Sequence, residues 1–290
     1  MGKIEKTSGS DNGMLTPGAG MRSKEDRTKC TFRTDYHIHT TFSDGKADPE
    51  EYVLAAINAG LNEIGFSEHL TLTAERQRWS MDPARLPEYI RHIASLKKKY
   101  TNIAIRTGVE LDYLPGKNKE IADVCQDYPF DYIIGSVHYM GDQTVDLGPE
   151  FYIGKDINLV FENYFNLVCE AISSGLFDII GHADLVRIHR FKPTVDITHL
   201  YEMVADSLAR HAVVFELNTN GRNKPLGDFY PDREYLHIFA NHGARVCVNS
   251  DAHNPARVGQ FFDEAYELLK INGFTEMSAF INRDCYQIPF

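Results

Sequence analysis

The chain has 290 residues, of which 43% are hydrophobic and 24% are charged, as in folded globular proteins and unlike disordered or fibrous ones. Its 41 acidic residues outnumber its 30 basic ones, and the net charge of −11 argues against broad binding to a nucleic-acid backbone or an anionic membrane. Five scattered cysteines without a CxxC pair argue against a disulfide scaffold, so we expect a protein of the reducing cytoplasm.

Residues 1–33 are rich in Gly, Ser, Lys and Thr without an apolar period, which predicts a flexible N-terminal tail. No stretch approaches the roughly 18 to 20 continuous apolar residues of a membrane span, and the start lacks the apolar region of a secretory signal. Residues 34–290 contain no repeat and no linker rich in Pro, Gly and Ser, so we expect a single domain there.

Short β-branched or aromatic runs alternate with longer helical patterns after the tail. The expected strands are 34–39, 62–66, 103–110, 131–138, 178–182, 213–218 and 245–250. The expected helices are 49–59, 83–100, 118–125, 158–173, 197–211, 233–242 and 260–271. Strands separated by helices predict parallel pairing with right-handed crossovers.

An open doubly wound sheet and a closed barrel both fit this alternation. A barrel collects site residues from the carboxyl ends of many strands, whereas an open sheet concentrates its ligands at one switch point. Nearly every expected strand here ends in a side chain that can bind a metal. The chain also lacks GxGxxG after the first strand and lacks GxxxxGK[ST], which disfavours dinucleotide and P-loop binding. We therefore expect a barrel.

The metal-capable side chains form a recognisable pattern. HxH in a strand places His37 and His39 on one face, and Asp251-Ala252-His253 repeats that spacing after the last expected strand. The candidate metal ligands are His37, His39, Asp44, His69, Glu110, His138, His182, Asp251 and His253. Nitrogen and oxygen donors without sulfur suit Zn, Mn or Fe, and this number of ligands would serve two or three ions.

Any one of these side chains has an ordinary explanation. A lone histidine in a strand is usually a buried or surface residue, and the Ser-Asp-Gly around Asp44 is also a common turn signal. The joint pattern favours a metal centre, because unrelated histidines would not fall at the ends of five expected strands together with acids. The histidines in or beside the helix patterns are expected to be solvated, and His189 stays undecided.

The motifs DYHIHTTFSDG, SEH, GVELDYLPG, GSVH, GHADL and NSDAH, in this order over residues 34 to about 275, resemble the polymerase and histidinol phosphatase (PHP) superfamily. GVELDY and KPLGDFYP are similar to its histidinol-phosphate phosphatases. The resemblance implies a distorted seven-stranded β/α barrel of the TIM type with three divalent transition-metal ions. It implies these ligand sets: His37, His39, Glu110 and Asp251 for one ion, Glu110, His138 and His182 for a second, and Asp44, His69 and His253 for the third.

The chain departs from this family near the expected substrate site. Asn223 stands where such phosphatases carry a basic residue, and segment 139–150 matches the family poorly. We expect Arg187, with Arg222 or Lys224, to bind the phosphate, since guanidinium and ammonium groups suit phosphoryl oxygens. A surface salt bridge is the alternative role for Arg187.

A charge count favours a phosphate ester as substrate. Three divalent ions carry a charge of about +6. Three carboxylates and one bridging hydroxide reduce this to roughly +2, which matches the charge of a phosphomonoester dianion. The expected reaction is in-line attack by a metal-bridging hydroxide, with Glu110 as the bridging ligand and Asp251, His253 or a metal-bound water protonating the leaving alcohol.

The resemblance makes L-histidinol phosphate, an intermediate of histidine biosynthesis, the expected substrate. Its ammonium and imidazole groups call for acidic and aromatic groups at the rim. The candidates for this rim are Asp112, Tyr113, Tyr139 and Asp142. No membrane and no extended nucleic acid is expected as a partner, and the oligomeric state is left open.

Three other functions stay open. A PHP-type phosphoesterase for nucleotides or short oligonucleotides is disfavoured because the sequence shows no extended basic and aromatic groove. A metal-dependent amidohydrolase would usually carry a metal-bridging lysine in mid-barrel, and the third to sixth expected strands supply none. A non-catalytic binding module is disfavoured because every ligand position is filled.

Overall fold

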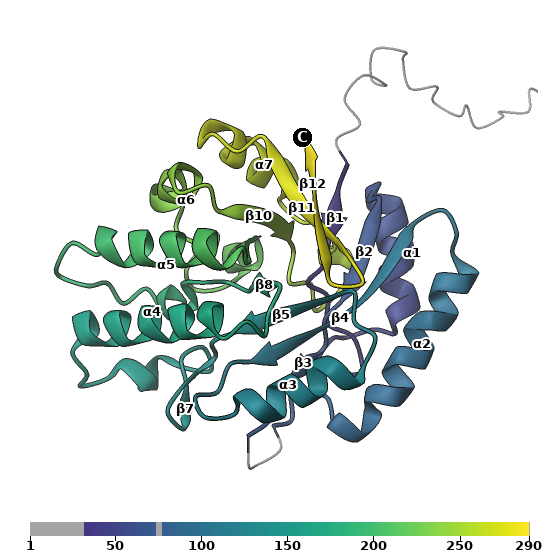
Figure 1. The fold of residues 1–290 in the computed structure, drawn as a ribbon, viewed down its shortest axis with the longest axis horizontal. Helices are drawn as coiled ribbons and strands as arrows, with labels where there is room; N and C mark the ends of the chain where they lie inside the picture. Colours follow the sequence, from purple (N-terminus) through teal and green to yellow (C-terminus); the bar gives the residue numbers. More distant parts are fainter. Residues whose placement is uncertain (1–31, 74–76, 290) are drawn as a thin grey trace, which may run out of the picture. The chain divides into compact units, whose positions relative to one another are not determined.

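Seven parallel strands form a nearly closed barrel, in the order in which they follow along the chain (Figure 1). They are β1 (Thr34–Asp35), β2 (Glu63–Phe66), β4 (Ala104–Asp112), β5 (Tyr132–Ser136), β8 (Ile179–Ile180), β9 (Val214–Asn218) and β10 (Arg245–Asn249). A short further strand, β3 (His69–Leu70), pairs with β4 beside this path. The computed structural model describes residues 32–73 and 77–289. The expected seven-stranded barrel is confirmed, while the predicted tail lies, up to residue 31, outside the described residues.

The barrel closes between its first and last segments. Ile38 pairs in parallel with Ala252. The amide of Ala252 donates to the carbonyl of His37, and the amide of His39 donates to the carbonyl of Ala252, both at 3.0 Å. This pairing sets the HxH segment directly beside the DAH segment.

Helices surround the strands (Figure 1). The α-helices of the described residues are α1 (Pro49–Ala59), α2 (Leu86–Lys99), α3 (Asn118–Asp127), α4 (Ile157–Ser173), α5 (Thr198–His211), α6 (Leu236–Asn241) and α7 (Phe262–Ile271). Short 3₁₀ turns are η2 (Pro83–Arg85), η3 (Pro149–Tyr152), η4 (Leu185–Arg187), η5 (Asn220–Asn223), η6 (Arg233–Tyr235) and η7 (Pro255–Arg257). Local signals explain α1, because the Asp48 side chain accepts a hydrogen bond from the Glu50 amide and Gly60 ends the helix with φ 73°.

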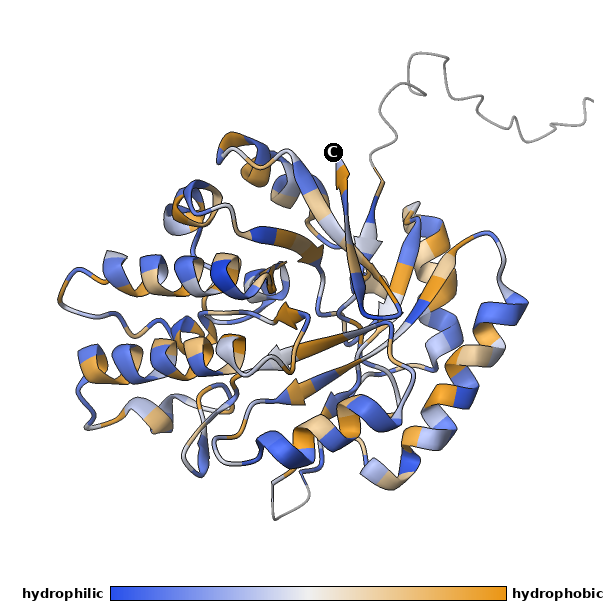
Figure 2. Cartoon of the chain, in the orientation of Figure 1, coloured by the Kyte–Doolittle hydropathy of each residue, from blue (hydrophilic) through white to orange (hydrophobic). Residues whose placement is uncertain are grey.

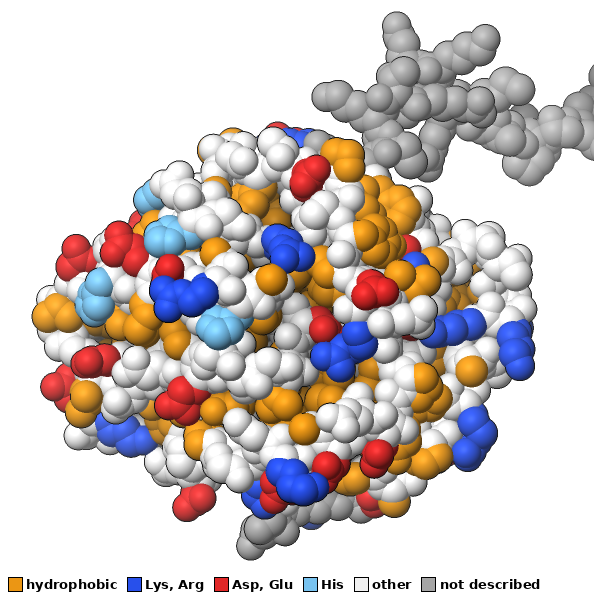
Figure 3. Space-filling model, viewed as in Figure 1, with side chains coloured by type: hydrophobic (Ala, Val, Ile, Leu, Met, Phe, Trp, Pro, Cys, Tyr) orange, Lys and Arg blue, Asp and Glu red, His pale blue; other side chains and the backbone are white. Residues whose placement is uncertain are grey.

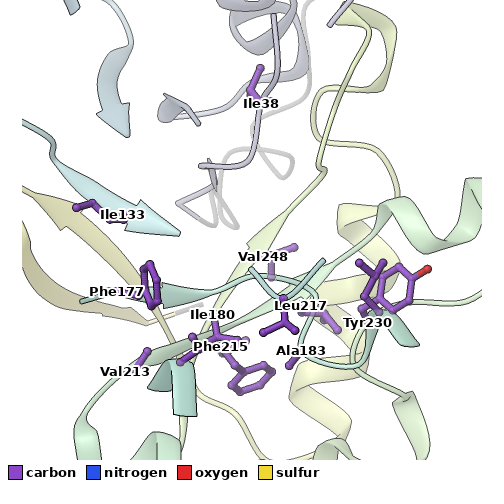
Figure 4. Packing of buried hydrophobic residues seen from close by; sticks show 14 of the residues in the cluster. Ile38, Ile133, Phe177, Ile180, Ala183, Val213, Phe215, Leu217, Tyr230 and Val248 are labelled. Atoms are coloured by element: carbon purple, nitrogen blue, oxygen red, sulfur yellow. The ribbon is translucent and has the colours of Figure 1, made fainter. Parts of the chain in front are cut away.

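Strand alternation divides the apolar core into two clusters. In β9, Phe215 and Leu217 belong to the larger cluster against the helices, whereas Val214 belongs to a smaller cluster inside the barrel. Figure 4 shows Phe215 and Leu217 packing near Ile180 and Val248. Figure 2 shows the matching pattern, with hydrophobic strands and helices that are hydrophobic along one stripe. The inner cluster consists of Tyr36, Tyr132, Ile134, Ile179, Val214, Cys247, Ala279 and Phe280.

A C-terminal hairpin, β11 (Glu276–Ile281) with β12 (Asp284–Pro289), was not expected from the sequence. Its turn uses Asn282 and Arg283 at positive φ instead of a glycine-containing pair. The amide of Arg283 donates to the carbonyl of Asp131, just before β5, and the Tyr286 hydroxyl donates to Glu63 at the start of β2. The hairpin therefore covers the amino-terminal end of the barrel. A second small hairpin pairs β6 (Tyr139–Met140) with β7 (Gln143–Thr144).

The surface carries charges of both signs. Acidic and basic side chains are interspersed on the face that Figure 3 presents. Over residues 32–73 and 77–289, no helix is both long and apolar enough to span a membrane.

Candidate metal centre

The nine predicted ligands meet at the carboxyl ends of the barrel strands. Each follows a strand or stands near its end, so the parallel order of the barrel directs all of them to the same side. Four groups have donor atoms within 4.8 Å of one another: His37, His39 and Asp251; His37, Glu110 and His182; His69, Glu110 and His138; and His39, Asp44, His69 and His253. No other His, Cys, Asp or Glu of the described part of the chain joins these groups.

Glu110 lies at the centre of the cluster, with its side chain 1% exposed. Its Oε2 atom is 3.2 Å from His37 Nε2 and 3.5 Å from His39 Nε2. Its Oε1 atom is 3.1 Å from His182 Nε2 and 3.7 Å from His138 Nε2. Oε2 also lies 2.6 Å from His69 Nδ1. One carboxylate therefore faces five imidazoles, three on one oxygen and two on the other, as a ligand shared by two ions would have to do.

Several donor atoms of the cluster are buried without a hydrogen-bond partner among the described residues: His37 Nε2, His39 Nε2 and Asp251 Oδ1. The four contacts of the two imidazole nitrogens with Glu110 Oε2 and Asp251 Oδ1 span 3.2 to 3.9 Å. An ion with tetrahedral bonds of about 2.1 Å separates its ligand atoms by about 3.4 Å. The donor types and their spacing therefore fit a divalent transition-metal ion.

Two buried carboxylates contact histidines of the cluster on the ring nitrogen that faces away from the other ligands. Neither was expected from the sequence to take part in the metal centre. Glu216 Oε1 lies 2.6 Å from His37 Nδ1, and Asp112 Oδ1 lies 2.6 Å from His138 Nδ1. A carboxylate on one ring nitrogen fixes the ring and leaves the other nitrogen for a metal. The expectation that Asp112 lines the substrate rim is wrong, because this residue is 3% exposed and contacts His138.

Glu216 is itself held by a polar network inside the barrel. Its Oε2 accepts hydrogen bonds from the His182 amide and the Asn218 side chain, and its Oε1 accepts one from the Asn249 side chain, all at 2.9 Å. A fully buried charge is tolerated when its oxygens are hydrogen-bonded in this way. The network links β9, β10 and the loop after β8 to the position of His37.

The charges of the cluster outweigh the effect of burial on the pKa of His37 and Glu110, and they add to it at His39. Burial alone would lower the pKa of His37, but Glu216 and Glu110 raise it well above its ordinary value. Burial would raise the pKa of Glu110, yet the neighbouring His69 and His37 hold it well below its ordinary value. Burial and the imidazole of His69 together lower the pKa of His39 well below the usual range. Protons and metal ions therefore compete for the same cluster.

The loop that carries Asp44 is anchored by a buried carboxylate. Glu68 accepts hydrogen bonds from the amides of Thr40 and Ser43, at 3.0 and 3.1 Å, and from the Thr40 hydroxyl at 2.6 Å. This places Asp44 Oδ1 3.3 Å from His253 Nε2. The predicted ligand in the turn thus reaches the cluster because its loop is tied to the strand below it.

The backbone of the site is also unusual. His182 and Asp251 have φ values of 23° and 48°, which side-chain-bearing residues rarely adopt. At Gly45 a Cβ atom would lie 2.0 Å from the carbonyl oxygen of His39, so this turn requires glycine. Such strain is typical of functional sites, where the surrounding structure holds residues in unfavourable conformations.

A cavity of about 250 Å³ opens onto the cluster. Its lining consists of Asp44, His69, Trp79, His138, Asp146, Leu147, His182, Leu185, Ile188, Lys224, Tyr230, Asp251 and His253. Among the described residues, Lys224 is the single Lys or Arg in this lining, whereas Arg222 forms an ion pair with Glu264 at 2.6 Å. The expected rim residues Tyr113, Tyr139 and Asp142 do not belong to the lining.

Arg187 belongs to a separate cluster of charges. Its Nη1 lies 2.9 Å from Asp184 and its Nη2 lies 2.7 Å from Asp232, and its side chain is 12% exposed. The residue lines a different cavity, of about 360 Å³. Its predicted contact with phosphate stays a prediction, and the structure shows a guanidinium already engaged by two carboxylates.

The PHP domain family model matches residues 35–220. The chain belongs to the PHP domain family. Among its PHP relatives, a probable histidinol-phosphatase of Deinococcus radiodurans is 34% identical over 248 residues, which cover 83% of this chain and 94% of the relative. A histidinol-phosphatase of Lactococcus lactis is 30% identical over 262 residues, covering 86% of this chain and 94% of the relative.

A solved structure is similar over nearly the whole PHP barrel. The histidinol phosphate phosphatase of Lactococcus lactis, in complex with zinc, L-histidinol and phosphate, matches with a TM-score of 0.77 at 28% identity, covering 88% of this chain and 98% of that chain. Family membership together with the buried clusters of His, Glu and Asp identifies a metal-dependent phosphoesterase of the PHP family.

Proposed function

We propose that this PHP protein is a phosphomonoesterase that hydrolyses L-histidinol phosphate to L-histidinol and phosphate. The observation that carries the proposal is the cluster of nine predicted ligands beside a cavity that Lys224 lines. The histidinol-phosphatase relatives cover most of the chain, which favours this substrate over others. We assign the phosphoesterase domain to residues 34–290.

We propose three divalent transition-metal ions, Zn, Mn or Fe, bound by the nine predicted ligands. When bound, such ions acidify a water molecule and neutralise the charge of a phosphoryl group. Glu110 would hold two of the ligand groups together, because its two oxygens face different histidines. Glu216 and Asp112 would keep the rings of His37 and His138 oriented.

The remaining groups of the cavity act on the substrate. Lys224 would attract the phosphate dianion, since it is the Lys or Arg that lines the cavity among the described residues. Asp251 and His253 both line the cavity and are the two candidates to protonate the leaving alcohol. Arg187 and Arg222 are already paired with carboxylates, which lowers the positive charge that either could offer to a phosphate.

The test is a panel of phosphomonoesters on protein of measured metal content. L-histidinol phosphate should exceed phenyl phosphate and nucleoside monophosphates in kcat/KM by several orders of magnitude. Strong chelators and the substitution His37→Ala should each abolish most of the activity.

Three results would contradict the proposal in different ways. If the enzyme prefers a nucleoside monophosphate or a short oligonucleotide, the proposed substrate is wrong, but the assignment as a metal-dependent phosphoesterase stands. If the protein keeps full activity in chelator with no metal bound, the proposed metal centre is wrong as well. Hydrolysis of amides with no action on any phosphoester would favour an amidohydrolase.

A further inference from the structure

Asp146 lies in the segment that follows β7, next to the proposed metal centre. The preceding residue, Val145, donates its amide hydrogen to the carbonyl of His138 at 2.9 Å and accepts a hydrogen bond from Tyr152 at 3.0 Å. The carbonyl oxygen of Asp146 lies 3.1 Å from His189 Nε2. These contacts hold the backbone of Asp146 beside a predicted ligand.

The side chain of Asp146 offers an unsatisfied acceptor to the cavity. It lines the cavity of the metal cluster, and its Oδ1 is buried without a hydrogen-bond partner among the described residues. The four groups of metal-capable side chains do not include it. An unpaired buried carboxylate oxygen costs stability, so its presence calls for a partner that arrives with a ligand.

The wall around Asp146 suits an organic group with a flat or apolar body. Leu147, Leu185 and Ile188 line the cavity together with the aromatic rings of Trp79 and Tyr230. Trp79 Nε1 and the Tyr230 hydroxyl are also buried without hydrogen-bond partners in the described part of the chain. The cavity therefore combines apolar surface with a few unsatisfied polar groups, as small-molecule sites do.

We propose that Asp146 recognises the leaving alcohol by accepting a hydrogen bond from its cationic N–H group, and so selects phosphomonoesters of amino alcohols. The inference rests on the proposed function and adds the residue that determines specificity. A carboxylate pairs more strongly with an ammonium or imidazolium than with a neutral donor. A leaving group without an N–H donor would leave the buried Oδ1 of Asp146 unpaired, which disfavours it.

The experiment compares the wild type with Asp146→Asn, which keeps the size of the side chain and removes its charge. Three substrates are used: L-histidinol phosphate, phosphoethanolamine and phenyl phosphate. We expect kcat/KM to fall by about ten- to a hundredfold for the two cationic esters and to change little for phenyl phosphate. L-histidinol alone, titrated by calorimetry, should lose affinity to a similar extent.

Controls separate recognition from folding and metal binding. Asp127→Asn at the exposed end of α3 makes the same chemical change away from the cavity and should match the wild type. Asp146→Glu restores the charge and should recover part of the preference for cationic esters. Metal content and Tm of each variant are measured alongside the kinetics.

The outcomes distinguish this inference from the proposed function. Equal losses for all three substrates, or no loss for any, would overturn the role of Asp146 even if the wild type prefers L-histidinol phosphate. If the wild type does not prefer L-histidinol phosphate but Asp146→Asn still loses activity only toward cationic esters, the proposed substrate fails and the role of Asp146 stands.

Discussion

Glu216 supports the metal centre through His37, with Glu216 Oε1 2.6 Å from His37 Nδ1. Both side chains are fully buried, and the residues are 179 positions apart in the sequence. Because the other ring nitrogen faces Glu110 at 3.2 Å, the position of Glu216 decides where His37 can coordinate.

Glu216→Gln should weaken metal binding by about ten- to a hundredfold, as expected when a carboxylate that orients a metal-binding histidine is lost. Elemental analysis after dialysis against a graded chelator, with kcat measured on the same samples, checks this. Glu276→Gln on the exposed start of β11 serves as the matched control. Unchanged metal content in Glu216→Gln would show that the network of asparagines suffices to hold His37.

The affinity for metal ions should increase as the pH rises. The imidazoles must be deprotonated to bind an ion, so apparent affinity should rise as pH rises and each ion bound should release protons. Calorimetric titration of metal-free protein in buffers of different ionisation enthalpy measures that release. Affinity that falls between pH 6 and pH 8, or binding without proton release, would contradict a histidine-rich site.

Lys224 and Arg187 should respond differently to replacement. Lys224→Ala should raise KM for phosphomonoesters with little change in Tm, because its side chain is exposed at the cavity. Arg187→Ala should lower the free energy of unfolding by about 3 kcal/mol, because it leaves the buried Asp184 without its cation. Thermal unfolding and steady-state kinetics on both variants check this. A stable Arg187→Ala enzyme with a raised KM would favour phosphate binding by Arg187.

Trp79 should report occupation of the site. It is the single tryptophan of the chain, lines the cavity, and its ring centroid lies 5.1 Å from that of His69 and 5.8 Å from that of His138. Its fluorescence should therefore change when metal is added to metal-free protein and change again on addition of L-histidinol. The variant Trp79→Phe serves as the control, because it lacks the tryptophan fluorescence. If saturating metal does not change the fluorescence of Trp79, the ions bind at another place than this cluster.

The nine candidate ligands could be found from the sequence because each belongs to a short motif at the end of an expected strand. The period of two in HxH and DAH is a local property, and parallel strands bring their carboxyl ends together without further information. The alternation of strands and helices fits an open sheet as well as a barrel, and the position of these ligands at the ends of nearly all expected strands favoured the barrel. The C-terminal hairpin was not expected, because a turn of Asn282 and Arg283 carries no recognised hairpin signal.

The supporting groups of the site were decided by tertiary structure. Glu216 sits inside an apolar strand, and nothing nearby in the sequence indicates that it faces His37 across the barrel. Arg187 has the right charge and a position close to His182, yet the fold pairs it with Asp232 from another loop. Sequence by itself determined which atoms can bind a metal, since that is a property of residue type and strand periodicity. Only the closed barrel decided which charges neutralise one another, because Coulomb and hydrogen-bond energies depend on distances that the chain sets by folding.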